Sequence, residues 1–462
     1  MIVNDTIIAL ATASGSGAIA VIRLSGENAI AFCEAHFKSV HGKILSQEDT
    51  HTIHLGHIVD GNRTLDEVLV SIFKNPQSYT GEDVVEISCH GSPYIQQEII
   101  QLFLRKGARI ANPGEFTLRA FLNAKLDLSQ AEAVADLIAS DSEASHQIAM
   151  QQMRGGFSNE IKMLREELMN FASLIELELD FAEEDVEFAN RQQFQDLISR
   201  ITKVLKRLID SFAVGNVIKN GIPIAIIGEP NVGKSTLLNA LLNEEKAIVS
   251  EIAGTTRDAI EDEISIGGIN FRFIDTAGIR DTKDVIESIG IKKTFEKIDQ
   301  AQVVVYLFDA ATSVSNLGIV LKEIEKIRNK NPQKPLIIIA NKIDKLDDIQ
   351  LAELNTHIPE VILLSAKSGF GLEELTDKLL GLINTGALRN NDTIITNSRH
   401  YDALLKALEE IIKVQEGIDA NLSGDLLAID IRQALYHFGE ITGEITNDDL
   451  LGNIFANFCI GK

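Results

Sequence analysis

A glycine-rich stretch between a short apolar run and a helix-forming run constrains the fold of this 462-residue chain more than any other feature. It reads Gly228-Glu-Pro-Asn-Val-Gly-Lys234-Ser235 and matches the pattern G-x-x-x-x-G-K-S. The apolar run 222–227 precedes it and the helix-like run 236–242 follows it. A strand, a turn and a helix start in this order form a phosphate cradle, because backbone N–H groups and the helix N-terminus face the anion. In such a cradle, Lys234 reaches the β- and γ-phosphates and the Ser235 hydroxyl contacts Mg²⁺.

Two further blocks predict a switch that senses the γ-phosphate. Thr255-Thr256 stand on a polar loop after Gly254, where a hydroxyl can complete the Mg²⁺ shell while a γ-phosphate is present. Such a loop orders with the triphosphate and relaxes after hydrolysis. Asp275-Thr-Ala-Gly278 ends the alternating run 269–274, so Asp275 can reach the metal and the Gly278 N–H can reach the γ-phosphate.

The last two blocks concern the base of the nucleotide. Asn341-Lys342-Ile343-Asp344 follows the apolar run 336–340, and the Asp344 carboxylate suits the paired donors on the edge of guanine. Opposite adenine this carboxylate would lie unpaired, so the sequence predicts GTP rather than ATP. Ser365-Ala366-Lys367, after the run 361–364, fits the remaining contact to the base.

One position differs from the Ras-like pattern. Ile279 occupies the place where small GTPases carry a glutamine that orients the attacking water, and an isoleucine cannot hydrogen-bond a water. Hydrolysis must therefore be driven from elsewhere. Asn231 either ligates a monovalent cation beside the β- and γ-phosphates, replacing the charge of an arginine finger, or only stabilises a turn. The residues alone leave both alternatives open.

The composition fits a multidomain cytosolic enzyme without a membrane partner. A chain of 462 residues is longer than a single hydrophobic core supports. No apolar run approaches the roughly 20 residues that cross a bilayer, and residues 1–10 lack the basic start of a secretory signal. The cysteines, Cys33, Cys89 and Cys459, are few and odd in number, which indicates reduced thiols in a cytoplasm.

The net charge of −24, from 67 acidic and 43 basic residues, gives the chain no global attraction for nucleic acid. Any contact with RNA must therefore be local or supplied by a basic partner.

Amphipathic helices flank the nucleotide-binding segment. In 158–181, 194–212 and 401–412, large apolar residues recur at steps of three and four. The simplest architecture inserts the switch between two halves of one helical domain. The predicted fold is multidomain α/β plus all-α, with an N-terminal α/β domain (1–120), the first half of a helical domain (121–215), an inserted Ras-like P-loop GTPase α/β domain (216–384) and the second helical half (385–462).

The N-terminal part has strand-like runs at 6–11, 18–24 and 84–88, separated by glycine-rich turns. Within it, Arg23 closes one apolar run, Glu86 interrupts another and Lys125 ends Phe121-Leu-Asn-Ala-Lys125; charges at such places are usually solvated. His51, His54 and His57 invite a metal interpretation. In an extended segment this spacing alternates faces, which favours ordinary strand histidines.

The tail Cys459-Ile-Gly-Lys462 has three interpretations. A thiol four residues from the end resembles a prenylation box, but Gly461 and Lys462 fit it poorly. Cys459 can also be a small apolar residue that caps Phe455 and Phe458. The third possibility is a reactive thiol on an end that docks into a distant site.

Taken together, these blocks resemble the bacterial tRNA modification GTPase MnmE (TrmE) family from end to end. The resemblance rests on the G motifs with Thr255-Thr-Arg-Asp258, on family-specific N-terminal runs and on the tail. These runs are Asp5-Thr-Ile-Ile-Ala with Arg23, Thr80-Gly-Glu-Asp-Val-Val-Glu86, Pro113-Gly-Glu-Phe and Phe121-Leu-Asn-Ala-Lys125.

The resemblance implies a homodimer whose N-terminal domain dimerises and binds 5-formyl- or 5,10-methylene-tetrahydrofolate, while the inserted domain hydrolyses GTP with Mg²⁺ and K⁺. It also implies an α2β2 heterotetramer with the flavoprotein MnmG (GidA), and FAD is expected only on this partner. The implied reaction is an aminomethyl-type (carboxymethylaminomethyl) modification at C5 of the tRNA wobble uridine. We further expect the paired switch domains to enclose the potassium ion and to hydrolyse GTP without an external activating protein.

Site residues carried over by motif fall into four groups. The folate site would be lined by Arg23, Glu86, Lys125 and Lys462. Ser235 and Thr256 would hold Mg²⁺, and Asn231 would ligate K⁺ with oxygens of Ser250, Ile252 and Thr255. Glu287, in Asp284-Val-Ile-Glu287, would position the attacking water through an intermediary. Lys234 and Cys459 are the other two candidate catalytic residues. The expected GTP contacts are Asn231, Val232, Gly233, Lys234, Ser235, Thr236, Ser250, Glu251, Ile252, Ala253, Gly254, Thr255, Thr256, Asp275, Thr276, Ala277, Gly278, Asn341, Lys342, Asp344, Ser365, Ala366 and Lys367.

Two other function classes compete. A ribosome-assembly GTPase would act as an RNA-binding timer, but the chain is acidic and lacks a G-x-x-G clamp in a basic C-terminal module. A self-sufficient folate-dependent transferase would need no flavin partner, and no G-x-G-x-x-G fingerprint occurs here to supply a flavin internally.

Overall fold

The structure is a computed structural model that describes residues 5–180, 191–244, 262–274, 298–382 and 393–445, together with 451, 454, 455, 458 and 461. The chain folds into two compact units. The first comprises Met1–Ala139, Ala149–Lys203 and Asp402–Lys462, and the second Ser140–Ile148 and Val204–Tyr401.

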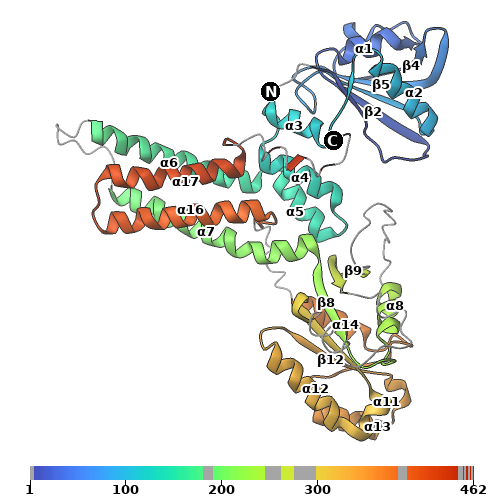
Figure 1. Cartoon of the computed structure of the whole chain (residues 1–462), viewed down its shortest axis with the longest axis vertical. Coiled ribbons are helices and arrows are strands. Elements are labelled where there is room, and N and C mark those ends of the chain that lie inside the picture. Colours follow the sequence, from blue (N-terminus) through green and yellow to red (C-terminus); the bar gives the residue numbers. More distant parts are fainter. Residues whose placement is uncertain are drawn as a thin grey trace. The chain divides into compact units, whose positions relative to one another are not determined.

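A seven-stranded sheet forms the N-terminal part of the first unit (Figure 1). Its strands are β1 (Ile7–Leu10), β2 (Ile19–Ser25), β3 (Phe37–Ser39), β4 (Thr52–Asp60), β5 (Arg63–Phe73), β6 (Val84–His90) and β7 (Arg109–Ile110). They lie in the order β3-β4-β5-β6-β2-β1-β7, and only the β1–β7 pair is parallel. Helices α1 (Ala29–His36) and α2 (Pro93–Leu104) cover one face, where alternate strand residues such as Ile22, Val70 and Ile87 form a core.

The strands predicted at 6–11, 18–24 and 84–88 are confirmed as β1, β2 and β6. Strand β4 contains His54 and His57, which confirms the extended segment expected there, whereas β5 was not predicted, because Asp66 and Glu67 interrupt its apolar alternation. His51 differs from the expected extended segment, since it precedes β4 in a left-handed conformation with φ 63°.

Long helices make up the remainder of the first unit and lead into the second. They are α3 (Glu115–Leu122), α4 (Leu128–Ala139), α5 (Glu143–Met153), α6 (Gly156–Asp180), α7 (Arg191–Asn220), α16 (Ser398–Asp419) and α17 (Gly424–Thr442). The apolar stripes predicted on α6 and α7 are buried, α6 packs along α17, and the rings of Phe171 and Phe194 stack with centroids 5.2 Å apart. Helix α3 crosses residue 120, where the sequence analysis placed a domain boundary.

The second unit contains a six-stranded sheet in the order β13-β12-β11-β8-β10-β9. Its strands are β8 (Ile222–Ile227), β9 (Asp262–Ile266), β10 (Ile269–Phe273), β11 (Val303–Asp309), β12 (Leu336–Asn341) and β13 (Ile362–Leu364). All neighbours are parallel except β9 and β10. The associated helices are α8 (Lys234–Glu244), α11 (Ala310–Ser313), α12 (Leu317–Lys330), α13 (Asp348–His357) and α14 (Leu372–Gly381).

Two apolar cores lie on opposite faces of this sheet. One contains Ile224, Leu237 and Leu375, and the other contains Ala225, Ile324 and Leu354. Strands buried on both faces explain the continuous apolar runs in the sequence. Among the helices that the structure describes, none is both long and apolar enough to cross a bilayer.

Candidate functional site

The parallel strands of the second unit bring the nucleotide motifs to one edge of the sheet. Gly228 follows β8, Asp309 ends β11, Asn341 ends β12 and Ser365 follows β13. Because these strands are parallel neighbours, their carboxyl ends meet at the same edge, which is where doubly wound sheets bind ligands.

The phosphate loop between β8 and α8 needs unusual backbone angles. Gly228, Asn231 and Gly233 have φ values of 154°, 64° and 102°. A Cβ atom on Gly228 would lie 2.0 Å from the carbonyl oxygen of Leu307 on β11, so only glycine allows this approach. Asparagine tolerates the left-handed region better than most residues, which explains Asn231 at its position.

Lys234 and Ser235 open helix α8, as the motif predicts. The Lys234 ammonium donates to the carbonyl oxygens of Gly228 at 2.5 Å and Glu229 at 3.1 Å, which holds it over the loop. Ser235 and Thr236 lie in the first turn of α8, where N–H groups and the helix dipole favour an anion. A hydroxyl beside such a cradle fits a Mg²⁺ ligand, and the exposed Asn231 side chain offers an oxygen that fits a monovalent cation.

Asn341 connects the base-recognition motif with the phosphate loop. Its side-chain amide donates to the Val232 carbonyl oxygen at 2.8 Å and accepts from the Ala366 N–H at 3.0 Å. The residue is only 2% exposed. Three separate sequence blocks are therefore joined through one buried amide.

Lys342 makes a second connection, which involves a residue that the sequence analysis missed. Its ammonium donates to the Asn231 carbonyl oxygen at 2.7 Å and pairs with the Asp309 carboxylate, also at 2.7 Å. Asp309 also caps α11 by accepting from the Ala311 N–H at 3.0 Å. Its position at the carboxyl end of an apolar strand, like that of Asn341, was the available signal.

The residues for the guanine edge also lie together. The Ser365 hydroxyl donates to the Asp344 carboxylate at 2.7 Å, and this hydrogen bond lowers the pKa of Asp344. Asp344 is therefore ionised at neutral pH and can accept two hydrogen bonds. Lys367 is exposed beside it.

The switch residues and part of the tail lie outside the described residues. These are Ser250, Glu251, Ile252, Ala253, Gly254, Thr255, Thr256, Asp275, Thr276, Ala277, Gly278, Glu287, Cys459 and Lys462.

Arg23 and Glu86 form a second polar site on the first unit's sheet. They are direct partners on β2 and β6, and the guanidinium contacts one carboxylate oxygen through Nε at 2.8 Å and Nη2 at 2.7 Å. Nη1 lies 3.4 Å from the carbonyl oxygen of Gly461 in the tail. Lys125 is exposed, and its ammonium donates to the Pro76 carbonyl oxygen at 2.8 Å.

The other candidates of the sequence analysis lie apart from these sites. His54 contacts Thr52 and His57 contacts Glu67, and within the described residues no group of three or more His, Cys, Asp or Glu side chains could hold a metal. Cys33 and Cys89 are free and buried; burial raises the pKa of the Cys89 thiol to about 11 and that of Cys33 further.

Comparisons with known proteins agree with this arrangement. The family model for the "MnmE helical domain" matches residues 128–459, and that for the "GTP-binding protein TrmE N-terminus" matches residues 6–125. The "tRNA modification GTPase MnmE" of Christiangramia forsetii is 72% identical over the full length of both chains. The proteins of the same name from Flavobacterium psychrophilum and Cytophaga hutchinsonii are 71% and 57% identical, covering 100% and 99% of this chain and 100% and 98% of theirs.

Both ends of the chain and the segment between them are therefore covered by matches to one family, and the nucleotide motifs meet at one edge of a sheet. This chain belongs to the MnmE family of tRNA modification GTPases.

Proposed function

We propose that this GTPase is potassium-stimulated and that, with a flavoprotein partner, it adds an aminomethyl-type group to C5 of the wobble uridine of tRNA, using a folate one-carbon unit. The observation that carries the proposal is the contact between Arg23 and Gly461. It joins a family-specific N-terminal residue to the family-specific tail, although 438 positions separate them. This contact supports a single binding site to which residues near both ends of the chain contribute.

The nucleotide chemistry follows from the phosphate loop. Lys234 and the first turn of α8 would hold the β- and γ-phosphates, and Asp344 would accept from the guanine edge. Bound Mg²⁺, held by Ser235 and Thr256, would neutralise charge on the transferred phosphoryl group. Glu287 would position the water in place of the absent glutamine.

Potassium stimulation would depend on Asn231. Its carbonyl oxygen is already fixed by Lys342, which leaves the exposed side-chain amide oxygen for a cation. Oxygens of Ser250, Ile252 and Thr255 would complete the ligand set. A cation there would stabilise negative charge between the β- and γ-phosphates.

The folate site would combine Arg23, Glu86, Lys125 and Lys462. The contacts of Arg23 Nε and Nη2 with one Glu86 oxygen fix the plane of the guanidinium, so Nη1 has a defined direction. A 5-formyl- or 5,10-methylene-tetrahydrofolate carries carboxylates that cations can bind. The role of Cys459 would be to react at this site or to pack beside Phe455 and Phe458, whose rings lie 5.1 Å apart.

Homodimerisation would involve the sheet face that carries Arg23. On this face Ile19, Ile53, Leu55 and Leu69 are 68%, 67%, 39% and 46% exposed. The strand registers place them on the side opposite the core under α1 and α2. Large exposed apolar side chains on one sheet face favour an interface between two copies.

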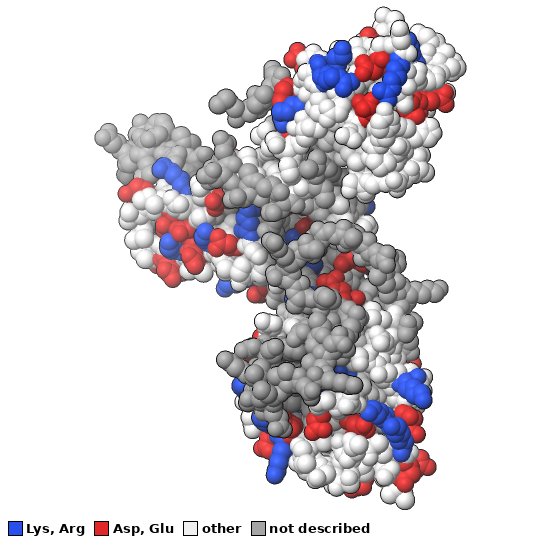
Figure 2. Space-filling model, turned by 45° about the vertical axis from the view of Figure 1, so that its right-hand side comes forward, with Lys and Arg blue, Asp and Glu red and all other residues white. Residues whose placement is uncertain are grey.

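We place the protein in the cytoplasm, where tRNA would contact only local parts of its surface. On the face shown in Figure 2, basic and acidic side chains are interspersed, and the whole chain carries a net charge of −24. A flavoprotein partner, MnmG in an α2β2 assembly, would supply FAD and part of the tRNA-binding surface.

Nucleoside mass spectrometry on total tRNA tests the modification role. Cells that lack the gene should lose C5-aminomethyl-type wobble uridines, and the wild-type gene should restore them. Unchanged nucleosides would favour the ribosome-assembly timer. Hydrolysis that is equally fast in sodium and potassium, or an Asn231→Ala variant that keeps the potassium effect, would contradict the cation role.

A further inference from the structure

The Arg23 guanidinium is held by more than its ion pair with Glu86. It faces two aromatic rings, with its central carbon 5.5 Å from the centroid of Tyr79 and 5.6 Å from that of Phe116. Both distances lie within the range of cation–π attraction. The Arg23 side chain is 18% exposed, so this attraction is less screened than at an open surface.

Each ring is itself fixed. Phe116 is fully buried in a cluster with Ile7, Ala9 and Ala111, and Tyr79 packs against the same cluster. The Tyr79 hydroxyl is 2.8 Å from the Thr117 hydroxyl, on the residue next to Phe116. Burial raises the pKa of Tyr79, while the Thr117 hydrogen bond and the Arg23 charge oppose this shift. Tyr79 is therefore a neutral, oriented ring.

Helix α3 and the turn after it also anchor the loop that carries Tyr79. The Arg119 guanidinium contacts both Glu82 oxygens, at 3.2 and 3.0 Å, and the Asn123 amide donates to the Thr80 carbonyl oxygen at 2.7 Å. Lys125 holds the start of the same loop through Pro76.

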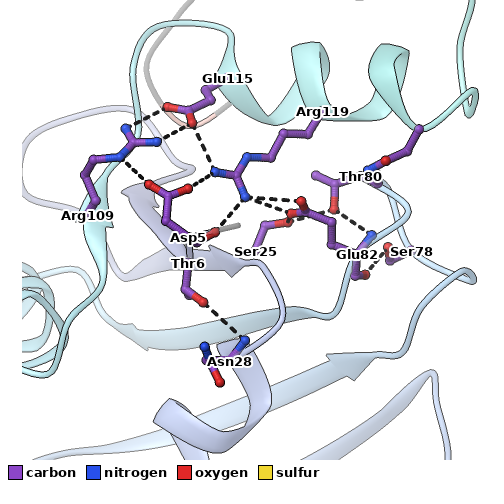
Figure 3. Close-up of polar contacts among 11 residues, drawn as sticks. Asp5, Thr6, Ser25, Asn28, Ser78, Thr80, Glu82, Arg109, Glu115 and Arg119 are labelled. Atoms are coloured by element: carbon purple, nitrogen blue, oxygen red, sulfur yellow. Dashed lines mark hydrogen bonds and ion pairs between the residues drawn. The ribbon is translucent and has the colours of Figure 1, made fainter. Parts of the chain in front are cut away.

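Arg119 belongs to a wider ionic network, shown in Figure 3. It also contacts Asp5 at 2.5 Å and Glu115 at 3.2 Å, and Arg109 contacts the same two carboxylates. At 8% exposure, Arg119 is the most buried cation of this network. The loop of Tyr79 is thus tied to the body of the unit by charged groups that water screens weakly.

We propose that Tyr79 and Phe116 are positioning residues that fix the Arg23 guanidinium for a bound anionic group, and that the Glu82–Arg119 pair holds Tyr79 for this task. The inference rests on the proposed folate site. Glu86 engages Nε and Nη2, and the two rings hold the plane, so that Nη1 is directed toward the Gly461 carbonyl oxygen, where the anionic group would bind. A long arginine side chain that is already ordered loses less conformational entropy when a carboxylate binds.

Calorimetric titration of the full-length protein with 5-formyl-tetrahydrofolate tests this role. Tyr79→Leu should weaken binding about 5- to 30-fold, because it removes a partly buried cation–π contact. Tyr79→Phe keeps the ring and should bind within about threefold of wild type. Glu82→Gln weakens the anchor of the loop and should fall between these two variants. Tyr94→Leu is a matched control, because the Arg63 guanidinium likewise lies over the Tyr94 ring, at 5.9 Å, while Tyr94 is 59% exposed.

A double-mutant cycle separates positioning from general damage to the fold. In an Arg23→Lys background, Tyr79→Leu should cost less than threefold, because the planar guanidinium that the ring holds is gone. Equal losses in both backgrounds would overturn the inference, as would wild-type affinity in Tyr79→Leu. If the wild-type protein binds no folate, the proposed folate function fails and the inference falls with it. If the wild type binds folate and the Tyr79 variants bind it with the same affinity, the inference alone fails.

Discussion

The buried Asn341 side chain donates a 2.8 Å hydrogen bond to the carbonyl oxygen of Val232, and these two residues are 109 positions apart in the chain. The contact ties the end of β12 to the phosphate loop. Since Asn341 also accepts from the Ala366 N–H, the segments for phosphate and base share one rigid anchor. The phosphate loop and the two segments proposed to bind the base are thereby held in a fixed relative position.

Replacing Asn341 should weaken the whole nucleotide site. Asn341→Ala leaves the buried Val232 carbonyl and Ala366 N–H without this partner, which should cost about 1–3 kcal/mol of unfolding free energy for each group left unsatisfied. Affinity for a fluorescent GDP analogue should fall at least tenfold. Urea melts and fluorescence titration measure the two effects, with the exposed Asn329→Ala on α12 as control. Wild-type affinity in Asn341→Ala would show that the anchor is dispensable.

A methyl group at Gly233 should disturb the same anchor from the other side. Gly233 has φ 102°, and an added Cβ would lie 2.4 Å from Asn341 Nδ2. Gly233→Ala should therefore abolish measurable nucleotide binding while the protein stays folded by circular dichroism. Gly318→Ala on α12, where a Cβ meets nothing within 4 Å, should be neutral or slightly stabilising. A Gly233→Ala protein that binds GDP normally would contradict the close approach.

The base specificity should follow the Asp344 carboxylate. Asp344→Asn replaces an acceptor by a group that also donates, so GTP affinity should fall about 100-fold or more. Xanthosine triphosphate presents a carbonyl instead of the amino group of guanine, so it should become the better ligand. Competition titrations with both nucleotides measure this exchange. Asp348→Asn, in the first turn of α13, is the control at an exposed aspartate. Equal loss of both nucleotides would indicate misfolding rather than a change of specificity.

Much of the nucleotide site could be predicted from the sequence because its motifs are local. A strand, a glycine-rich turn and a helix start occupy adjacent positions, and the apolar runs before Gly228, Asn341 and Ser365 have strand length. Periodicity likewise identified α6 and α7. Parallel strand order then brings these motifs to one edge without further information.

The parts that could not be predicted depend on long-range pairing. Asp309 contacts Lys342 only because β11 and β12 are neighbours, and nothing in a run of seven residues indicates that pairing. The ring of Tyr79 likewise meets Arg23 through the packing of α3, which no local pattern encodes. Charged residues such as Arg119 and Glu115 resemble ordinary solvated helix residues in sequence, yet they are 8% and 9% exposed.

The ionic network of Figure 3 should make the N-terminal part sensitive to acid. Burial raises the pKa values of Asp5 and Glu115, but hydrogen bonds and charges from Arg109 and Arg119 outweigh it and hold both below their ordinary values of 3.8 and 4.5. For carboxyls with a lowered pKa in the folded state, the stabilisation is complete above those ordinary values and is lost as the pH falls through the folded pKa. We therefore expect the melting temperature to fall below pH 4.5.

Removing one partner of the network tests its contribution at neutral pH. Arg119→Met leaves the partly buried carboxylates of Asp5, Glu82 and Glu115 without one of their cations and should cost about 3–5 kcal/mol. Its melting temperature should also depend less on pH between 5 and 3 than that of the wild type. Arg105→Met, which removes a pair with Asp60 at the surface, should cost less than about 1 kcal/mol. Equal pH profiles for Arg119→Met and wild type would show that other groups cause the acid sensitivity.

The tail should dock through the backbone of Gly461. This residue has φ 98°, and an added Cβ would lie 2.2 Å from the carbonyl oxygen of Leu10, beside the carbonyl that faces Arg23. Gly461→Ala should therefore displace the tail. Since the proposed folate site includes Lys462, affinity for 5-formyl-tetrahydrofolate should fall about tenfold, while the melting temperature stays within about 2 °C of the wild type. Gly42→Ala carries a similar positive φ of 67° with nothing within 4 Å of the added atom, so it controls for backbone strain alone. If both alanine variants bind folate as tightly as the wild type, the docked tail takes no part in the site.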